Sequence, residues 1–174
     1  MTLKAWRYYV PLLGLIIIIS FCWRGLSLHP QALPSVLIDQ PAANFTLPNL
    51  LEPKQWVDQR VLHGSWTLLN VWASWCQTCT EEQAFLLTLK QRYPQLQIIG
   101  VDFQDNPVAA RAWLKRYGNP YHLVLADLSG KVGVDYGVYG TPENFLIDEQ
   151  GIIRAKVTGV LNEQHWATMA ILLT

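Results

Sequence analysis

Charged residues are scarce in this sequence of 174 residues: only 15% are charged and 51% are hydrophobic. In soluble domains about a quarter of all residues are usually charged. The thirteen Lys and Arg residues are balanced by thirteen Asp and Glu residues, and no basic cluster stands out. A nucleic-acid-binding surface is therefore excluded, because such surfaces concentrate positive charge. The sequence also lacks repeats and low-complexity stretches, and its length allows one ordinary domain plus an additional segment.

Cysteine is also scarce, with only Cys22, Cys76 and Cys79 in the chain. Cys22 lies in an apolar run and is interpreted as a small apolar residue, which leaves the other two as a lone pair. Two cysteines three residues apart close a minimal loop and would stabilise a fold little. A structural zinc site needs four ligands, and only His63 is near the pair in sequence. The pair is therefore predicted to be a working disulfide.

Charge is absent altogether from the apolar run of residues 8–23. As a helix this run reaches about 24 Å, and snorkelling arginines with interfacial aromatic residues extend it towards the roughly 30 Å of a hydrocarbon core. No small-residue cleavage site follows the run, which argues against a cleaved signal peptide. Bulky Phe21 before Cys22 argues against a lipoprotein signal. We expect residues 1–24 to be an uncleaved membrane anchor with a cytoplasmic N-terminus, because basic residues precede the run.

The rest of the chain is expected to be a tether at residues 25–41 and a folded domain at residues 42–174. The tether prediction rests on its prolines and on the absence of periodicity. In the domain, apolar runs predict strands at 44–47, 57–62, 66–73, 96–102, 121–126, 144–147 and 152–157. Helical periodicity predicts helices at 76–93, 107–117 and 162–173, with a short helix or loop at 127–138. This order indicates an α/β fold with parallel strands, right-handed crossovers and a closing β-hairpin.

Cys76 and Cys79 stand where a buried strand passes into a long helix. A helix N-terminus carries about half a positive charge and free N–H donors, and both stabilise a thiolate. Cys76 is therefore expected to be the better nucleophile at neutral pH. Cys79, one turn further, can attack any mixed disulfide that Cys76 forms. The pattern predicts a centre of thiol–disulfide exchange.

Two stretches of the sequence resemble a known family. Residues 72–79 read Trp-Ala-Ser-Trp-Cys-Gln-Thr-Cys, and residues 137–143 read Gly-Val-Tyr-Gly-Thr-Pro-Glu. With Gly-Asn-Pro-Tyr at residues 118–121, they resemble the CcmG/DsbE thiol:disulfide interchange proteins of cytochrome c maturation, relatives of TlpA and ResA. The resemblance covers the chain from about residue 44 onward. It implies a thioredoxin-like fold, a mixed central sheet flanked by helices, with an N-terminal transmembrane helix.

The resemblance also implies roles for individual residues. Cys76 and Cys79 would form the redox-active disulfide, with Cys76 as the exposed nucleophile and Cys79 as the resolving thiol. Pro142 would be a cis-proline facing the pair, and Thr141 would offer its backbone to an extended substrate. Trp75, just before the nucleophile, is expected in the apolar rim that partners touch.

Two acids complete the predicted site. Glu82 and Glu143 match acidic residues that the family places around the dithiol, where they could move protons and raise thiol pKa values. The alternative for Glu82 is an ordinary solvated acid near a helix start. Thioredoxin itself buries an aspartate where this chain has Asn70, so one of the two glutamates would have to serve instead. The dipeptide at residues 77–78 is Gln-Thr, where the family commonly has proline first.

The function that the resemblance implies is reduction outside the cytoplasmic membrane. The protein would be a membrane-anchored periplasmic protein-disulfide reductase that keeps the Cys-x-x-Cys-His cysteines of apocytochrome c reduced, directly or through a maturation partner. A membrane electron donor of the DsbD/CcdA type would regenerate the dithiol. The protein would also contact the inner membrane through residues 8–23. No nucleic-acid partner is expected. No metal or organic cofactor is expected.

Several alternatives stay open beside this function. One is a general TlpA- or ResA-like reductase for other extracytoplasmic targets such as copper-site assembly proteins. Another is a thioredoxin-fold adaptor that binds a maturation factor without turnover. A DsbA-type oxidase is disfavoured by the Trp-Cys-x-x-Cys context and the anchor. A peroxiredoxin is disfavoured because Trp72 stands where its Pro-x-x-x-Thr-x-x-Cys motif needs proline.

Overall fold

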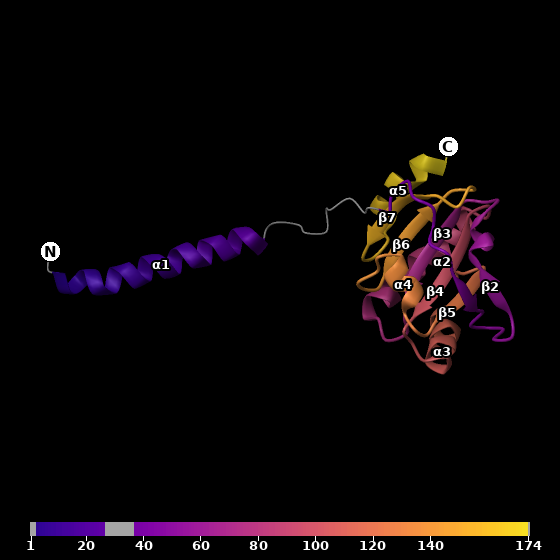
Figure 1. Ribbon diagram of the computed structural model, residues 1–174, viewed down its shortest axis with the longest axis horizontal. Helices are drawn as coiled ribbons and strands as arrows, with labels where there is room; N and C mark the ends of the chain where they lie inside the picture. Colours follow the sequence, from indigo (N-terminus) through magenta and orange to yellow (C-terminus); the bar gives the residue numbers. More distant parts are fainter. Residues whose placement is uncertain (1–2, 27–36, 174) are drawn as a thin grey trace. The chain divides into compact units, whose positions relative to one another are not determined.

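The computed structural model describes residues 3–26 and 37–173. The chain divides into two compact units, residues 1–34 and residues 35–174. The first contains one helix, α1 (Leu3–Leu26), with Pro11 inside it (Figure 1). Among the described residues, no helix combines the length and the apolar character that a membrane span requires. Most of the predicted tether falls on residues 27–36, outside the described ranges.

The second unit is built on a five-stranded sheet with the order β5-β4-β3-β6-β7 (Figure 1). The strands β3, β4 and β5 are parallel, whereas β6 runs antiparallel to both β3 and β7. The predicted mixed sheet with a terminal hairpin is therefore confirmed. The strand bounds are β3 (Thr67–Trp72), β4 (Gln97–Phe103), β5 (Leu123–Asp127), β6 (Glu143–Ile147) and β7 (Ile153–Thr158).

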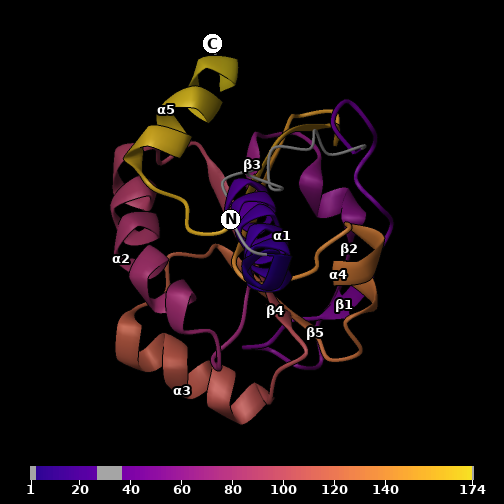
Figure 2. The same ribbon diagram turned by 90° about the vertical axis from the view of Figure 1, so that its left-hand side faces the viewer.

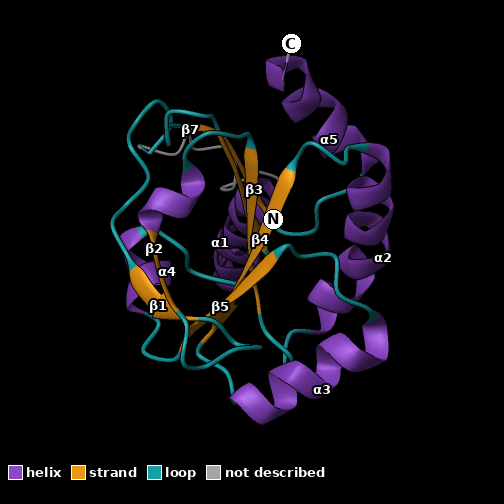
Figure 3. Cartoon of the chain, turned by 90° about the vertical axis from the view of Figure 1, so that its right-hand side faces the viewer, coloured by secondary structure: helices purple, strands orange, loops and turns teal. Residues whose placement is uncertain are grey.

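Helices and a small second sheet cover the two faces of the central sheet (Figures 2 and 3). One face carries α2 (Gln77–Arg92), α3 (Pro107–Tyr117) and α5 (Glu163–Ala170). The other face carries α4 (Lys131–Asp135) and the two-stranded sheet of β1 (Thr46–Pro48) and β2 (Trp56–Asp58). The layers are those of the predicted α/β fold.

Two of the predicted elements differ from the structure. The strand expected at residues 57–62 ends at Asp58, and Gln59–Leu62 form a 3₁₀ helix instead. The Asp58 side chain accepts a hydrogen bond from the Arg60 amide and so caps this turn. The last predicted helix ends at Ala170 and passes into a 3₁₀ helix, Ile171–Leu173.

The central strand β3 is buried along its whole length, as its apolar sequence predicts. Leu68 and Trp72 pack into the core under α2 and α3, whereas Leu69 and Val71 pack into the core on the opposite face. Trp72 stacks on Trp113 of α3, with 4.8 Å between the ring centroids. The end of β3 is therefore rigidly held at the point where the Cys-x-x-Cys stretch follows.

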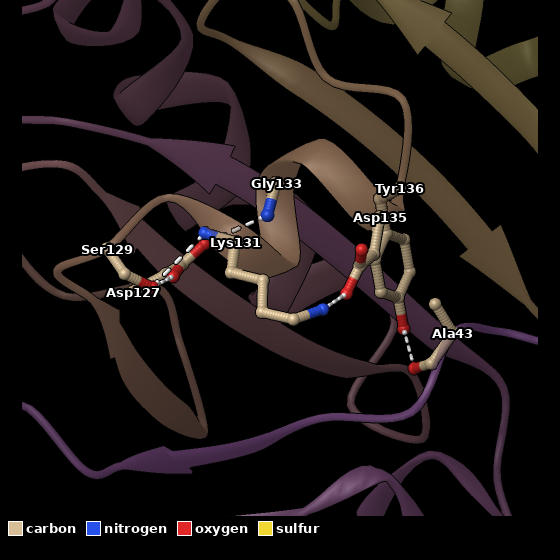
Figure 4. Close-up of polar contacts among 7 residues, drawn as sticks. All are labelled: Ala43, Asp127, Ser129, Lys131, Gly133, Asp135 and Tyr136. Carbon is tan, nitrogen blue, oxygen red and sulfur yellow. Dashed lines mark hydrogen bonds and ion pairs between the residues drawn. The ribbon is translucent and has the colours of Figure 1, made fainter.

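Polar contacts fix the corner that follows β5 (Figure 4). Asp127 is fully buried, and one of its carboxylate oxygens accepts the Gly133 amide at 2.8 Å. The other accepts the Ser129 hydroxyl at 3.3 Å. At the far end of α4 the Tyr136 hydroxyl donates to the Ala43 carbonyl at 3.2 Å. The carboxyl end of β5 is therefore connected by hydrogen bonds to the turn at Ser129 and to α4.

Candidate active site

The cysteine pair closes a disulfide at the start of α2, with 2.09 Å between the two sulfurs. Cys76 is the N-cap of α2, and its Sγ also accepts the Cys79 amide at 3.1 Å. The exposed Cys76 that we expected is not found, since its residue is 5% exposed against 2% for Cys79. The reason is that in this oxidised state its sulfur both bonds to Cys79 and caps the helix.

The segment before the disulfide is held by the turn after β4. The Ser74 amide donates to Asp105 Oδ2 at 2.5 Å, and the Trp75 indole donates to the Gln104 carbonyl at 3.3 Å. The rest of the Trp75 side chain is open to solvent, and the residue is 59% exposed. An exposed indole beside the disulfide agrees with the predicted apolar rim.

Thr141 and Pro142 reach the same edge of the sheet from the other side. The peptide bond between them is cis, as the resemblance implies. The strand β6 runs antiparallel to β3 with Glu143 opposite Val71. Residues 141 and 142 therefore continue past the end of β3, towards the stretch that leads into Cys76. Two halves of the predicted site, about sixty residues apart in sequence, meet at this edge.

Glu82 lies on α2, three residues after Cys79, where it is buried and surrounded by donors. Its carboxylate accepts the Asn70 side-chain amide at 2.8 Å, the Asn144 side-chain amide at 2.7 Å and the Leu161 backbone amide at 2.5 Å. Burial raises the pKa of Glu82 to about 7, although all three donors act in the opposite direction. The residue is 1% exposed, so the alternative of a solvated helix-start acid is wrong.

Asn70 links this acid to a second hydrogen-bonding group. Its side-chain oxygen accepts the Tyr121 hydroxyl at 2.7 Å, while its amide donates to both Glu82 and Asn144. Where thioredoxin has an aspartate, this chain thus has an amide that donates to the buried Glu82. A carboxyl group with a pKa near neutrality can take up or release a proton at working pH.

Glu143 has a different environment, although it is also fully buried. Its Oε2 lies 2.7 Å from the Lys156 ammonium, and its Oε1 accepts the Tyr139 amide at 3.3 Å. Lys156 also donates to the Gly137 carbonyl at 2.9 Å and lies 5.1 Å from the centroids of two aromatic rings. The ion pair therefore ties the loop containing the cis-proline to β7.

Comparisons with known proteins agree with this geometry. The family model described as AhpC/TSA family matches residues 38–156. The thiol:disulfide interchange protein DsbE of Allochromatium vinosum is 41% identical over 96% of this chain and 92% of its own length. The DsbE of Pasteurella multocida is 44% identical over 92% of this chain and 90% of its own length. The chain belongs to the AhpC/TSA family and to the DsbE thiol:disulfide interchange proteins.

A solved structure extends the comparison to the fold. The putative thiol:disulfide interchange protein DsbE from Chlorobium tepidum has a TM-score of 0.65 and is 26% identical, covering 76% of this chain and 93% of its own. The fold is thus thioredoxin-like, and the protein is a protein-disulfide oxidoreductase with a disulfide-forming pair, Cys76 and Cys79. Its relatives carry out thiol:disulfide interchange by name, which is the chemistry that the pair predicts.

Several residues around the pair were not predicted from the sequence. Asn144 and Leu161 both bind Glu82, and Lys156 pairs with Glu143. Asp102 is a further buried acid at the end of β4. Its signal in the sequence is a single carboxylate among the mostly apolar residues of β4.

Proposed function

We propose that this protein is a reductase that keeps the Cys-x-x-Cys-His cysteines of apocytochrome c, or of a maturation partner, in the dithiol state. The observation that carries the proposal is the Cys76–Cys79 disulfide at the start of α2, with the titratable Glu82 buried beneath it. The similarity to DsbE proteins over almost the whole chain supports the same chemistry.

The proposed reaction takes place in two exchange steps. The Cys76 thiolate attacks one sulfur of the substrate disulfide, so that a mixed disulfide forms and the other substrate sulfur leaves as a thiolate. The Cys79 thiolate then attacks Cys76 Sγ, which breaks the mixed disulfide and releases the second substrate thiol. Two electrons pass to the substrate, whose thiolates take up two protons. The protein ends as the disulfide that the structure contains.

Glu82 is proposed to hold the proton that Cys79 must lose before it attacks. The two residues are three positions apart on α2 and therefore lie on the same helix face. A carboxyl group with a pKa of about 7 accepts such a proton readily at neutral pH. Glu143 is proposed to act differently, by fixing the loop of Thr141 and Pro142 that a substrate peptide would contact together with Trp75.

We also propose that residues 1–24 hold the protein at the outer face of the inner membrane, with the compact unit of residues 35–174 in the periplasm. The tether is shorter than the predicted residues 25–41, because the Asp39 amide and the Gln40 carbonyl hydrogen-bond to Ile153 of β7. Support comes from the charge-free run of residues 8–23 and from its large apolar side chains. The large apolar residues from Val10 to Phe21 that lie on the surface of α1 are each at least 52% exposed. Extraction of membranes with alkaline carbonate tests this: the protein should stay with the lipid, and release into the supernatant would count against an anchor.

The decisive experiment traps the substrate. In cells that express the Cys79→Ser variant, the mixed disulfide on Cys76 cannot resolve, and its partners can be identified by mass spectrometry. We expect apocytochrome c, its maturation proteins, and a membrane electron donor of the DsbD/CcdA type. The variant with both cysteines changed to Ser is the control and should trap nothing.

Other outcomes point to the alternatives. Recovery of copper-site assembly proteins alone would replace the cytochrome proposal by a general TlpA- or ResA-like reductase. Full maturation of cytochrome c in cells that carry only the double-Ser variant would indicate an adaptor that does not turn over. Reduction of insulin by the soluble domain as fast as by thioredoxin would contradict a specific reductase.

A further inference from the structure

A short turn after β4 holds the segment that leads into the disulfide. The turn contributes two contacts, one from the Asp105 carboxylate to the Ser74 amide at 2.5 Å and one from the Gln104 carbonyl to the Trp75 indole at 3.3 Å. Ser74 and Trp75 directly precede Cys76, the N-cap of α2. The position of the Cys76 sulfur at the helix start therefore depends on how this segment is held.

The turn itself has a fixed place. The Gln104 amide donates to the Asp127 carbonyl at 3.0 Å, and Gln104 adopts a φ of 47°, in the left-handed region that few side chains adopt. Asp105 Oδ1 accepts the Asn106 amide at 2.6 Å, which leaves Oδ2 for Ser74. Asp127 is locked in turn by Ser129 and the start of α4 (Figure 4). The turn that contains Asp105 is therefore held in place by hydrogen bonds to the end of β5.

A second acid lies behind Asp105. Asp102 is the partner of Trp72 on β3 and of Ala126 on β5, and it shares the sheet face of Trp72, Cys76 and Cys79. It is fully buried, and within the described part of the chain no N–H or hydroxyl donor reaches its carboxylate oxygens. An ionised carboxylate in such a place would be costly. Burial, the charge of Asp105 and a hydrogen bond between the two carboxyl groups raise the pKa of Asp102 to about 8.

The groups that face Asp102 do not offset a negative charge on it. Its strand neighbours Trp72 and Ala126 are uncharged. Among the described residues, the titratable groups on this side are Asp105 in the turn, the thiols of reduced Cys76 and Cys79, and the phenol Tyr121. The pKa of Tyr121 is itself raised by burial and by the charges of Glu82 and Asp102. A proton on Asp102 therefore removes the repulsion that an ionised Asp102 would exert on Asp105.

We propose that Asp105 is a positioning residue of the dithiol site, which holds the Ser74–Trp75 segment so that Cys76 stays at the helix start, and that the buried Asp102 affects how firmly Asp105 holds that segment. This inference rests on the proposed role of Cys76 as the nucleophile. Ionisation of Asp102 would push Asp105 away from the Ser74 amide. The thiolate of reduced Cys76 would then lose part of its stabilisation by the helix N-terminus.

The first test compares two substitutions at one position. The protein is reduced, and the rate at which iodoacetamide alkylates Cys76 is followed at pH 7 by mass spectrometry of the peptide. Asp105→Ala removes the acceptor for the Ser74 amide, and we expect the rate to fall about fivefold, the effect of losing one ordinary hydrogen bond. Asp105→Asn keeps an acceptor oxygen and should stay within about twofold of the wild type.

The second test uses the pH profile. In the wild type, the alkylation rate of Cys76 should rise as the thiol ionises and then fall below a single-ionisation curve above a pH of about 8, where Asp102 ionises. Asp102→Asn cannot ionise, so its profile should follow the single curve. Asp135→Asn is the matched control, since this surface carboxylate pairs with Lys131, and its profile should be that of the wild type.

The outcomes separate this inference from the proposed function. If Cys76 in the reduced wild type is no more reactive than Cys22, the proposed function fails. If Cys76 is reactive but Asp105→Ala alkylates at the wild-type rate, or Asp105→Asn falls as far as Asp105→Ala, the positioning role is wrong. Wild-type and Asp102→Asn profiles of the same shape would overturn the part assigned to Asp102. Thermal melting of each variant shows whether it is folded, and the Asp105 pair remains informative if Asp102→Asn is not.

Discussion

Glu82 and Glu143 both lie beside β3, where Glu82 binds Asn70 and Glu143 pairs with Val71, and both are fully buried, but their surroundings differ. Glu82 is bound by three neutral donors, whereas Glu143 is paired with the Lys156 ammonium. Neutral donors only partly offset desolvation, so the pKa of Glu82 rises to about 7. A cation neutralises the charge directly and leaves a structural ion pair. The tasks proposed for the two acids, proton exchange for Glu82 and anchoring of a loop for Glu143, follow this difference in their surroundings.

Removal of the cation should have the largest effect. Lys156→Met leaves the carboxylate of Glu143 buried without its partner, and we expect the unfolding free energy at pH 7 to fall by about 3 kcal/mol or more. The double variant Lys156→Met/Glu143→Gln should recover most of this loss, because no unpaired charge remains. Urea denaturation measures both. Equal losses in the single and double variants would mean that packing, and not charge, explains the effect.

The pH dependence of stability should distinguish Glu82. Its folded pKa of about 7 lies above the ordinary 4.5, so the folded state binds the extra proton between these values. Its contribution to stability is therefore complete below a pH of about 4.5, declines as the pH rises to about 7, and is constant above that. The wild type should lose about 3 kcal/mol through Glu82 across this window, and Glu82→Gln should remove that part of the slope.

Glu81→Gln is the matched control for this measurement, because Glu81 is the exposed neighbour of Glu82 on the same helix. Its unfolding free energy should follow that of the wild type at every pH. If the slopes of Glu82→Gln and the wild type were equal, Glu82 would be ionised throughout, and the contrast with Glu143 would disappear.

The rate of exchange should show the same contrast. Glu82→Gln should slow the resolving attack of Cys79 about a hundredfold at pH 7, because a positioned proton acceptor is lost. Rapid quenching with a model disulfide peptide would then show the mixed disulfide on Cys76 accumulating. Glu143→Gln should leave this step nearly unchanged and weaken peptide binding instead. A slow resolving step in both variants would assign proton exchange to both acids.

The smallest effect is expected at the outer end of the Glu82 network. Tyr121→Phe removes the hydroxyl that donates to Asn70 and should cost about 1 kcal/mol of unfolding free energy. The resolving step should slow far less than in Glu82→Gln. Chemical denaturation and the same quenching experiment provide the two numbers, and a hundredfold loss here would show that Asn70 needs Tyr121 to orient the acid.

The fold and the centre of the site could be predicted because their signals are local. The spacing of Cys76 and Cys79 at a strand-to-helix boundary is contained in a few residues. The partners of the acids are not local: Asn144 and Leu161 reach Glu82 from 62 and 79 residues away. Lys156 reaches Glu143 across β6 and β7, whose register shifts at Leu146 and Ile147. A register irregularity of this kind leaves no recognisable pattern in the sequence.

The amide of Leu161 donates to Glu82 and so connects the segment before α5 to the proposed proton acceptor. Leu161 is the last fully buried residue before α5, whose Trp166 packs into the core beneath α2. A chain shortened before residue 161 would lose one of the three donors to the Glu82 carboxylate and expose that carboxylate to water. We would then expect Glu82 to titrate like a surface glutamate. The segment from Leu161 to α5 thus keeps water away from Glu82.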